Sequence, residues 1–290
     1  MWLLYALLGA VGKSYSGFFR KKMAGNVSGT MYMWLGYAAI SIALSPLLLV
    51  SGAEIVSMLQ QSWLVIIGVA LSSILATVLN LQALKHEELS YTAPLNAFVP
   101  VFTLLIAVVF LQESLPVAGV LGIFIIVVGA YVINIKAGRT TKWLDPLKHL
   151  FTNIGARLSL VVAFGFAINT VLLKVLTDQS YNPFTILFVT TAVKWLLLAY
   201  VPFVKKDELR LVAKSNKLIV LGATVSSFAG TFFHILAVAG TNASYAVSVR
   251  RLEAPISVLI GWRHLKESNI RNKLIGSLFM VAGAVTIALS

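Results

Sequence analysis

The chain has 290 residues and a formal net charge of +13, with 59% hydrophobic residues, only 11% charged residues and no cysteine. A soluble domain carries roughly 25% charged residues, so this composition excludes a water-soluble globular protein. The lack of cysteine excludes a disulfide framework and thiolate chemistry.

Ten apolar stretches follow one another along the chain, and each is close to the roughly 20 residues needed to cross about 30 Å of hydrocarbon. A lone strand cannot satisfy its backbone groups in lipid, so we expect helices. The sequence therefore predicts an all-α integral membrane protein with ten transmembrane helices. The stretches are Trp2–Phe19, Met31–Val50, Trp63–Leu84, Tyr91–Leu111, Val117–Ile135, Leu158–Leu176, Pro183–Val204, Leu218–Ala239, Ser244–Trp262 and Leu274–Leu289.

The first stretch differs from a cleaved signal peptide. No basic residue precedes its apolar run, and its charges, Arg20, Lys21 and Lys22, follow it. We therefore expect it to be a retained helix.

The chain contains an internal repeat. Residues 90–133 align without a gap onto residues 244–287, at a constant shift of 154, and 12 of these 44 positions are identical. Unrelated apolar sequences match at roughly a tenth of positions, so duplication explains the identity better. Many transporters consist of two repeats around a site near the bilayer midplane. We predict a first five-helix repeat over 1–135, a linker over 136–156 and a second repeat over 157–290.

The positive charge follows the loops between these stretches. The odd-numbered loops hold 18 of the 23 Lys and Arg residues, whereas the even-numbered loops hold none. Cytoplasmic loops carry the basic excess, so we predict a multi-pass protein of the cytoplasmic membrane with both termini outside. Five helices per repeat is an odd number, and the second repeat must therefore be inverted. Because topology accounts for the charge, we expect no nucleic-acid partner.

The repeated segment carries recognisable motifs. The first copy runs from Ser90-Tyr-Thr-Ala-Pro to Leu111-Gln-Glu113 and continues with Gly122 and Gly129; the second contains Leu252-Glu-Ala-Pro255, Leu265-Lys-Glu267, Gly276 and Gly283. These motifs resemble the fourth and fifth helices of the EamA-like branch of the drug/metabolite transporter superfamily. The resemblance implies a ten-helix carrier without a cofactor. It also implies a central cavity lined mainly by the first, third, fourth, sixth, eighth and ninth helices.

The ninth stretch holds three charged residues, Arg250, Arg251 and Glu253, and the two arginines depart from the apolar residues of many such relatives. Charges in a membrane helix are costly and therefore mark functional candidates. Arg250 and Glu253 are three residues apart, so they can form a local ion pair on one helical face. The alternative is that an arginine binds an anionic group of the substrate and that Glu253 carries a coupling proton.

Further polar candidates lie in other stretches. Asn80 and His234 occupy equivalent positions at the shift of 154. The histidine is either a structural hydrogen-bond donor or a site residue, and its near-neutral pKa suits proton coupling. Asn96 precedes Pro100 by four residues, so we expect the proline to free its carbonyl. Lys13 either projects into the cavity or extends to the cytoplasmic surface.

Gating and stacking candidates complete the predicted site. Pro100 and Pro255 are expected to kink their helices, and Pro255 to free the carbonyl of Arg251. Glu113 and Glu267 recur in both repeats and either close two gates or simply solvate helix ends. Tyr91 and Tyr245 either stack on a substrate or pack. Lys194 has no nearby carboxylate in the sequence and either extends to the surface or faces the bundle.

Enzyme and ATP-binding motifs are missing from the sequence, as are patterns typical of a metal site. We therefore predict a secondary transporter of a small polar or amphiphilic metabolite, such as an amino acid or an organic anion. Its partners are the substrate, the lipid bilayer and candidate protons, and it acts as a monomer or a homodimer. The alternatives are a membrane scaffold or regulatory subunit of a lipid-modifying system, and a flippase for lipid-linked substrates.

Overall fold

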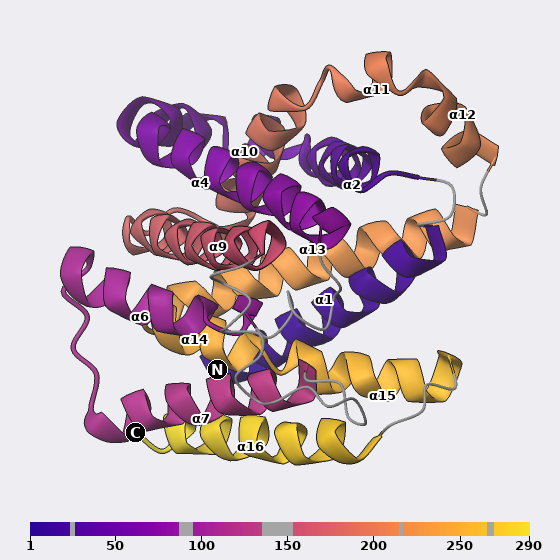
Figure 1. The fold of residues 1–290 in the computed structure, drawn as a ribbon. Coiled ribbons are helices and arrows are strands. Elements are labelled where there is room, and N and C mark those ends of the chain that lie inside the picture. Colours follow the sequence, from indigo (N-terminus) through magenta and orange to yellow (C-terminus); the bar gives the residue numbers. More distant parts are fainter. Residues whose placement is uncertain (24–26, 87–94, 135–152, 215–216, 266–269) are drawn as a thin grey trace.

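The computed structural model describes residues 1–23, 27–86, 95–134, 153–214, 217–265 and 270–290, and helices are its regular elements (Figure 1). They are α1 (Trp2–Met23), α2 (Gly29–Leu44), α3 (Leu47–Val50), α4 (Gly52–His86), α6 (Val99–Phe110), α7 (Val117–Asn134), α9 (Ile154–Asp178), α10 (Pro183–Leu197), α11 (Val201–Val204), α12 (Lys206–Lys214), α13 (Lys217–Ala239), α14 (Ala243–Arg250), α15 (Glu253–Leu265) and α16 (Ile270–Ala288).

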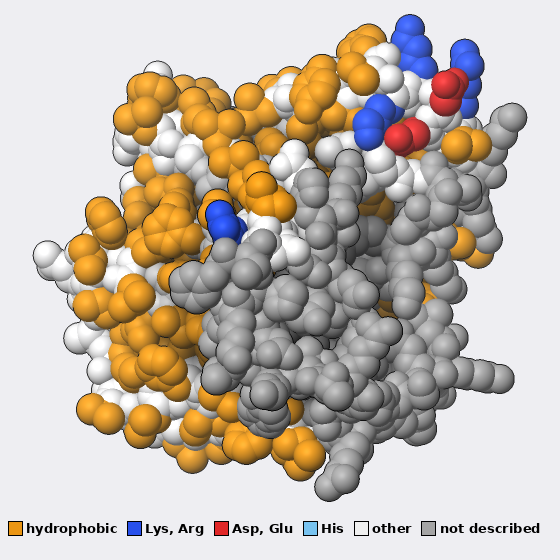
Figure 2. Space-filling view, in the orientation of Figure 1, with side chains coloured by type: hydrophobic (Ala, Val, Ile, Leu, Met, Phe, Trp, Pro, Cys, Tyr) orange, Lys and Arg blue, Asp and Glu red, His pale blue; other side chains and the backbone are white. Residues whose placement is uncertain are grey.

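Several of these helices match the predicted membrane stretches. Within the described residues, four helical segments are long and apolar enough to cross a membrane: Gly52–Ala83, Ile154–Asp178, Pro183–Val204, which comprises α10 and α11, and Lys217–Ala239. Shorter apolar helices include Gly29–Leu44, Val99–Phe110, Val117–Val132 and Ile275–Ala288. Figure 2 shows hydrophobic side chains over much of the described surface on the face drawn, with most of the visible Lys, Arg, Asp and Glu side chains near α12. Both the length of the helices and this apolar exterior fit a multi-pass membrane protein.

Prolines mark where predicted stretches divide or begin. The second, seventh and ninth stretches each form two helices, contrary to the expectation of one helix each. Pro46 precedes α3, Pro202 lies at the start of α11, and Pro255 lies in the first turn of α15. Pro100 likewise stands at the start of α6 rather than inside a helix. The first-turn N–H groups have no intrahelical acceptor, so a proline fits there without losing a hydrogen bond.

The most extensive helix contacts among the described residues join the first half of the chain to the second. They pair α1 with α13, α7 with α16, α4 with α9, and α2 with α10. In Figure 1, α7 and α16 run side by side at one edge, and α4 and α9 are stacked together. The two halves of the chain therefore pack against each other through these helix pairs instead of forming separate units.

Glycines allow the closest of these contacts. A Cβ on Gly129 of α7 would lie 2.6 Å from the carbonyl oxygen of Gly276, and a Cβ on Gly283 of α16 would lie 2.6 Å from that of Gly122. Contacts this short leave no room for a side chain. Small residues are what allow membrane helices to approach closely, because lipid provides no hydrophobic force between them.

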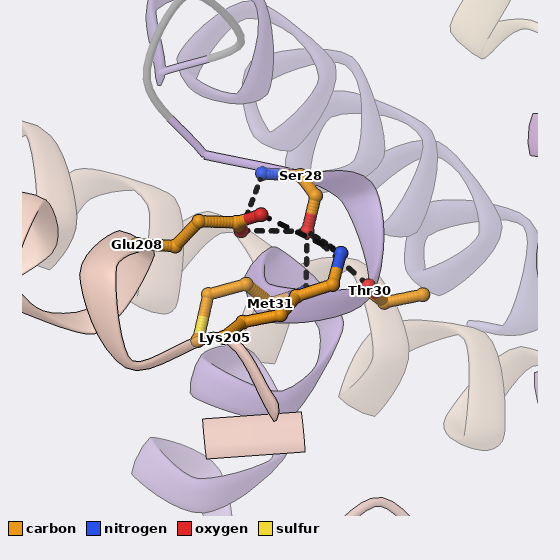
Figure 3. A network of polar contacts seen from close by, with 5 residues as sticks. All are labelled: Ser28, Thr30, Met31, Lys205 and Glu208. Carbon is orange, nitrogen blue, oxygen red and sulfur yellow. Dashed lines mark hydrogen bonds and ion pairs between the residues drawn. The ribbon is translucent and has the colours of Figure 1, made fainter. Parts of the chain in front are cut away.

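A polar cluster joins α2 to the α11–α12 region (Figure 3). The carboxylate oxygen Oε2 of Glu208 accepts hydrogen bonds from the backbone N–H of Ser28 at 2.9 Å and from its hydroxyl at 2.7 Å. Lys205 Nζ donates to Ser28 Oγ at 2.6 Å and lies 3.5 Å from Glu208 Oε1. Ser28 is the N-cap of α2, since its hydroxyl also accepts from Met31 N. The cluster thus fixes the first turn of α2.

We expect Gly129→Ala and Gly283→Ala to destabilise the protein, because the added methyl group must push a backbone carbonyl away. Overpacking of this kind costs about 1–3 kcal/mol. The matched control is Gly36→Ala in α2, where an added Cβ meets nothing within 4 Å. Thermal unfolding in detergent measures the effect. Equal midpoints for all three variants would contradict the close packing of α7 and α16.

The Glu208 cluster predicts a pH-dependent stability. Partial burial by itself raises the pKa of Glu208, but the hydrogen bonds from Ser28 and the charge of Lys205 outweigh it and hold the pKa below the ordinary 4.5. A carboxylate with a lowered folded-state pKa stabilises the fold fully above pH 4.5, and this stability is lost as the pH falls below that value.

We therefore expect Glu208→Gln to lower the unfolding midpoint at pH 7 by on the order of 2–4 °C. Between pH 5 and pH 3, the midpoint of this variant should fall less than that of the parent protein. Asp207→Asn is the control, because that side chain is 94% exposed in its pair with Arg210. If the unfolding midpoint depends on pH in the same way in the parent protein and in Glu208→Gln, the cluster does not make the stability depend on pH.

Candidate functional site

The predicted ninth helix breaks at its charged residues. α14 ends at Arg250, α15 begins at Glu253, and the chain turns through Arg251 and Leu252. The N–H of Arg251 donates to Ser248 O, that of Leu252 to Val249 O and that of Ala254 to Arg251 O, each at 3.0 Å. The expectation that Pro255 frees the Arg251 carbonyl is therefore wrong. Tight i→i+3 turns satisfy the backbone through the break.

The charges at the break match the ends of the two helices. Arg250 is in the last turn of α14 and Glu253 in the first turn of α15. Cations are favoured at helix C-termini and anions at N-termini, so the break itself stabilises both charges.

The ion pair at the break joins Arg251 Nη1 to Glu253 Oε1 at 3.9 Å, with the side chains 20% and 26% exposed. The predicted pairing of Arg250 with Glu253 assumed a continuous helix, and the turn at Arg251 removes that geometry. Arg250 Nε and Glu253 Oε2 are both buried without a hydrogen-bond partner. The site thus keeps one guanidinium N–H and one carboxylate oxygen unsatisfied.

Helix α1 contacts the break directly. The hydroxyl of Ser14 lies 2.8 Å from the carbonyl oxygen of Glu253 and 2.9 Å from that of Ala10. This contact was not predicted, because a serine among other small residues in a helix gives no signal of a partner 239 residues away. The contact holds α1 against the start of α15.

His234 on α13 lies beside the same charges. It is only 5% exposed, and its Nδ1 has no hydrogen-bond partner. Its imidazole is within electrostatic reach of four cations, namely Arg250, Lys13, Arg251 and Lys194. The structure therefore brings four of the predicted site residues together, and it adds Lys194 to them.

Lys194 on α10 is buried, with only 7% of its surface exposed. Its Nζ lies 5.6 Å from the ring centroid of Tyr37, and no carboxylate of the described residues lies within ion-pairing distance. Of the two alternatives that the sequence left open, extension to the surface or a position facing the bundle, the Lys194 side chain therefore takes the second. Lys13, by contrast, is an exposed residue on α1.

The two predicted asparagines also meet. Asn96 Nδ2 donates to Asn80 Oδ1 at 3.2 Å, while Asn96 Oδ1 is buried without a partner. Asn80 lies on α4 and Asn96 just before α6. At the shift of 154, Asn80 and Asn96 correspond to His234 and Arg250.

The remaining predicted residues have separate places. Glu113 accepts hydrogen bonds at the start of α14, from Ala243 N at 2.6 Å and Ser244 Oγ at 3.1 Å. Tyr245 has packing contacts: its hydroxyl lies 3.0 Å from Ser290 Oγ, and its ring stacks on Trp2. Tyr91 and Glu267 lie outside the described residues. Within the described residues, no group of three or more His, Asp or Glu residues is arranged to hold a metal ion.

Comparison with solved structures supports the fold. One solved protein, described only as "Crystal structure of protein", superposes with a TM-score of 0.73 at 15% sequence identity and covers 98% of this chain and 96% of its own. At that identity the likeness concerns the fold alone. No curated protein matches the sequence.

A sequence family supplies the classification. The model of the EamA-like transporter family matches two segments, residues 1–135 and 153–289, which together span nearly the whole chain. The chain therefore belongs to the EamA-like transporter family.

Proposed function

We propose that this membrane transporter moves a small metabolite bearing an anionic group across the cytoplasmic membrane, as a secondary transporter that works by alternating access. The main observation that supports this proposal is the excess of positive charge around His234. Arg250, Arg251 and Lys194 stand there, and among the described residues one carboxylate lies near them, that of Glu253, which forms an ion pair with Arg251. Buried charges are costly unless they are paired, so an anionic substrate group would complete the site.

The unsatisfied polar atoms support the same proposal. Arg250 Nε, His234 Nδ1, Asn96 Oδ1 and Glu253 Oε2 are buried without hydrogen-bond partners. Native proteins rarely leave such groups unpaired, and a bound ligand is one common explanation. A substrate with a carboxylate and a polar head, such as an amino acid or organic anion, offers partners for both the donors and the acceptors.

We propose further that ten membrane spans form two inverted repeats, 1–135 and 157–290, joined by the basic linker 136–156, with both termini outside. The helix contacts support this. Exchanging the halves turns the α1–α13 pair into the α9–α4 pair, while α7–α16 and α2–α10 map onto themselves. At the shift of 154, the Gly122–Gly283 contact likewise maps onto Gly129–Gly276.

In this scheme the transporter opens alternately to the two faces of the membrane, and the helices that contain breaks move. Glu113 closes one face by holding the start of α14, and Glu267 is proposed to do the same on the other. Pro100 stands at the start of α6, and Pro255 stands at the start of α15, where Arg251 and Leu252 separate two helical parts. Such breaks allow half-helices to tilt without losing further backbone hydrogen bonds.

The anion-binding prediction concerns Arg250→Gln and Lys194→Met. Each removes a positive charge, and a hydrogen bond to a charged group contributes about 1.5–3 kcal/mol. Affinity for the best organic anion should therefore fall about 10- to 150-fold. Isothermal titration of the detergent-purified protein measures it, after a thermal-shift screen of amino acids, organic acids, nucleosides and quaternary amines has identified a binder.

Arg210→Gln is the control, because that guanidinium is 78% exposed on α12 and should not affect binding. If only neutral or cationic compounds bind, the anionic preference is wrong. An anion that binds both variants with parental affinity would place the anion site elsewhere in the chain.

The proton-coupling prediction concerns Glu253. Its unpartnered Oε2 is a site where a proton can bind as the substrate is released. In proteoliposomes, Glu253→Gln should abolish the uptake that a pH gradient drives, yet retain exchange between internal and external substrate, because exchange needs no net proton movement. His234→Gln tests the second candidate in the same assay. Gradient-driven uptake that survives in both variants would assign coupling to another residue or ion.

A further inference from the structure

Two carboxylates outside the proposed substrate site hold the ends of α2 and α10. The first is Glu54, in the first turn of α4. It accepts hydrogen bonds from Asn182 N at 2.6 Å and from Thr185 Oγ1 at 2.7 Å. Asn182 is the N-cap of α10, and its own side chain accepts from Phe184 N. A residue of the first half therefore fixes the start of a helix in the second half.

The second carboxylate is Glu208, which binds the backbone N–H of Ser28, the N-cap of α2 (Figure 3). Here a residue of the second half fixes the start of a helix in the first. The two arrangements are copies of one another: 54 + 154 = 208 and 28 + 154 = 182, the shift of the internal repeat. In both, the carboxylate accepts from the backbone N–H of the N-cap residue of the partner helix.

The loops place the two ties on different faces of the membrane. Residues 51–62, around Glu54, contain no Lys or Arg, whereas residues 205–217, around Glu208, contain five. By the distribution of basic residues, the first lies outside and the second inside. Between them, α2 packs against α10, and Ser41 Oγ lies 3.4 Å from Thr191 Oγ1.

We propose that α2 and α10 form the fixed axis of alternating access, pinned by Glu54 on one face and Glu208 on the other. The proposal rests on the proposed transport function. A gate must separate on one face in each working state, whereas an axis keeps its contacts on both faces throughout. Charge-assisted hydrogen bonds to backbone donors suit an axis, because they are strong and directional. The moving contact then lies on the other side of the bundle, where Glu113 binds the start of α14.

Cysteine cross-linking tests the axis, and the chain has no cysteine of its own to remove. The axis pairs are Glu54→Cys with Thr185→Cys, and Ser28→Cys with Glu208→Cys. The gate pair is Glu113→Cys with Ser244→Cys. The two cysteines of each double variant are joined by a short bis-methanethiosulfonate, which forms a disulfide with each thiol and releases sulfinate. Uptake in proteoliposomes is compared before cross-linking, after it and after a reductant has cleaved the disulfides.

Cross-linking either axis pair should leave at least half of the uptake of the same uncross-linked variant. Cross-linking the gate pair should lower uptake at least tenfold, and reduction should restore it. Loss of uptake on cross-linking an axis pair, restored by reduction, would overturn the proposal. So would full uptake in the cross-linked gate pair, because the motion would then lie elsewhere.

A second measurement does not depend on transport. Spin labels at Ala53→Cys and Phe184→Cys report the outer end of the axis, and labels at Ser114→Cys and Gly240→Cys report the gate. Pulsed dipolar spectroscopy in nanodiscs should give one narrow distance for the axis pair and a broad or two-peaked distribution for the gate pair. A broad axis distribution beside a narrow gate distribution overturns the axis, while absence of uptake in every variant, with the expected distances, counts only against the transport function.

Discussion

Every polar backbone group in the apolar layer must find a partner within the chain, and the rest of this structure depends on that constraint. It explains why helices are the regular elements of the described residues and why the prolines among those residues stand at or just before helix starts, where an N–H is not needed. It also explains the form of the break after Arg250. The turns through Arg251 and Leu252 keep the backbone bonded at 3.0 Å, and Ser14 of α1 binds the carbonyl of Glu253. The break is therefore a packed element held by another helix.

Such a break gives the chain charges that an intact helix would not easily accommodate. Arg250 benefits from the C-terminal end of α14 and Glu253 from the N-terminal end of α15. The surrounding helices then add Lys194 and His234 without adding a second carboxylate to the described cluster. The local helix ends thus offset part of the cost of burial, and the unpaired remainder is available to a ligand. In the proposed function, this division separates the interactions that stabilise the fold from those that bind substrate.

Carboxylates at helix starts recur in this protein as links between the two halves. Glu54, Glu113 and Glu208 each accept a backbone N–H from the first residues of a helix in the opposite half. The first N–H groups of a helix have no intrahelical acceptor, and the helix dipole favours an anion there. A single acidic side chain can therefore fix a helix end without a matching side chain opposite. Lipid supplies no hydrophobic force between helices, so these polar links and the glycine contacts hold the halves together.

The sequence by itself determined the class of the protein and many of the residues in its polar centre. The length of the apolar stretches predicted the helices, and the repeat at a shift of 154 residues indicated Asn80, His234 and the two halves of the chain. Both signals depend only on the composition and the order of residues along the chain. The same shift also relates Glu54 to Glu208, but nothing in it indicates that each meets an N-cap in the other half.

Only the tertiary structure decided which candidates meet. In the structure Lys194 is buried, Arg251 instead of Arg250 forms the ion pair with Glu253, and the ring of Tyr245 stacks on Trp2. Helical periodicity gives the direction of a side chain only while the helix continues. It carries no information on which neighbouring helix lies opposite, because lateral packing joins residues far apart in the chain.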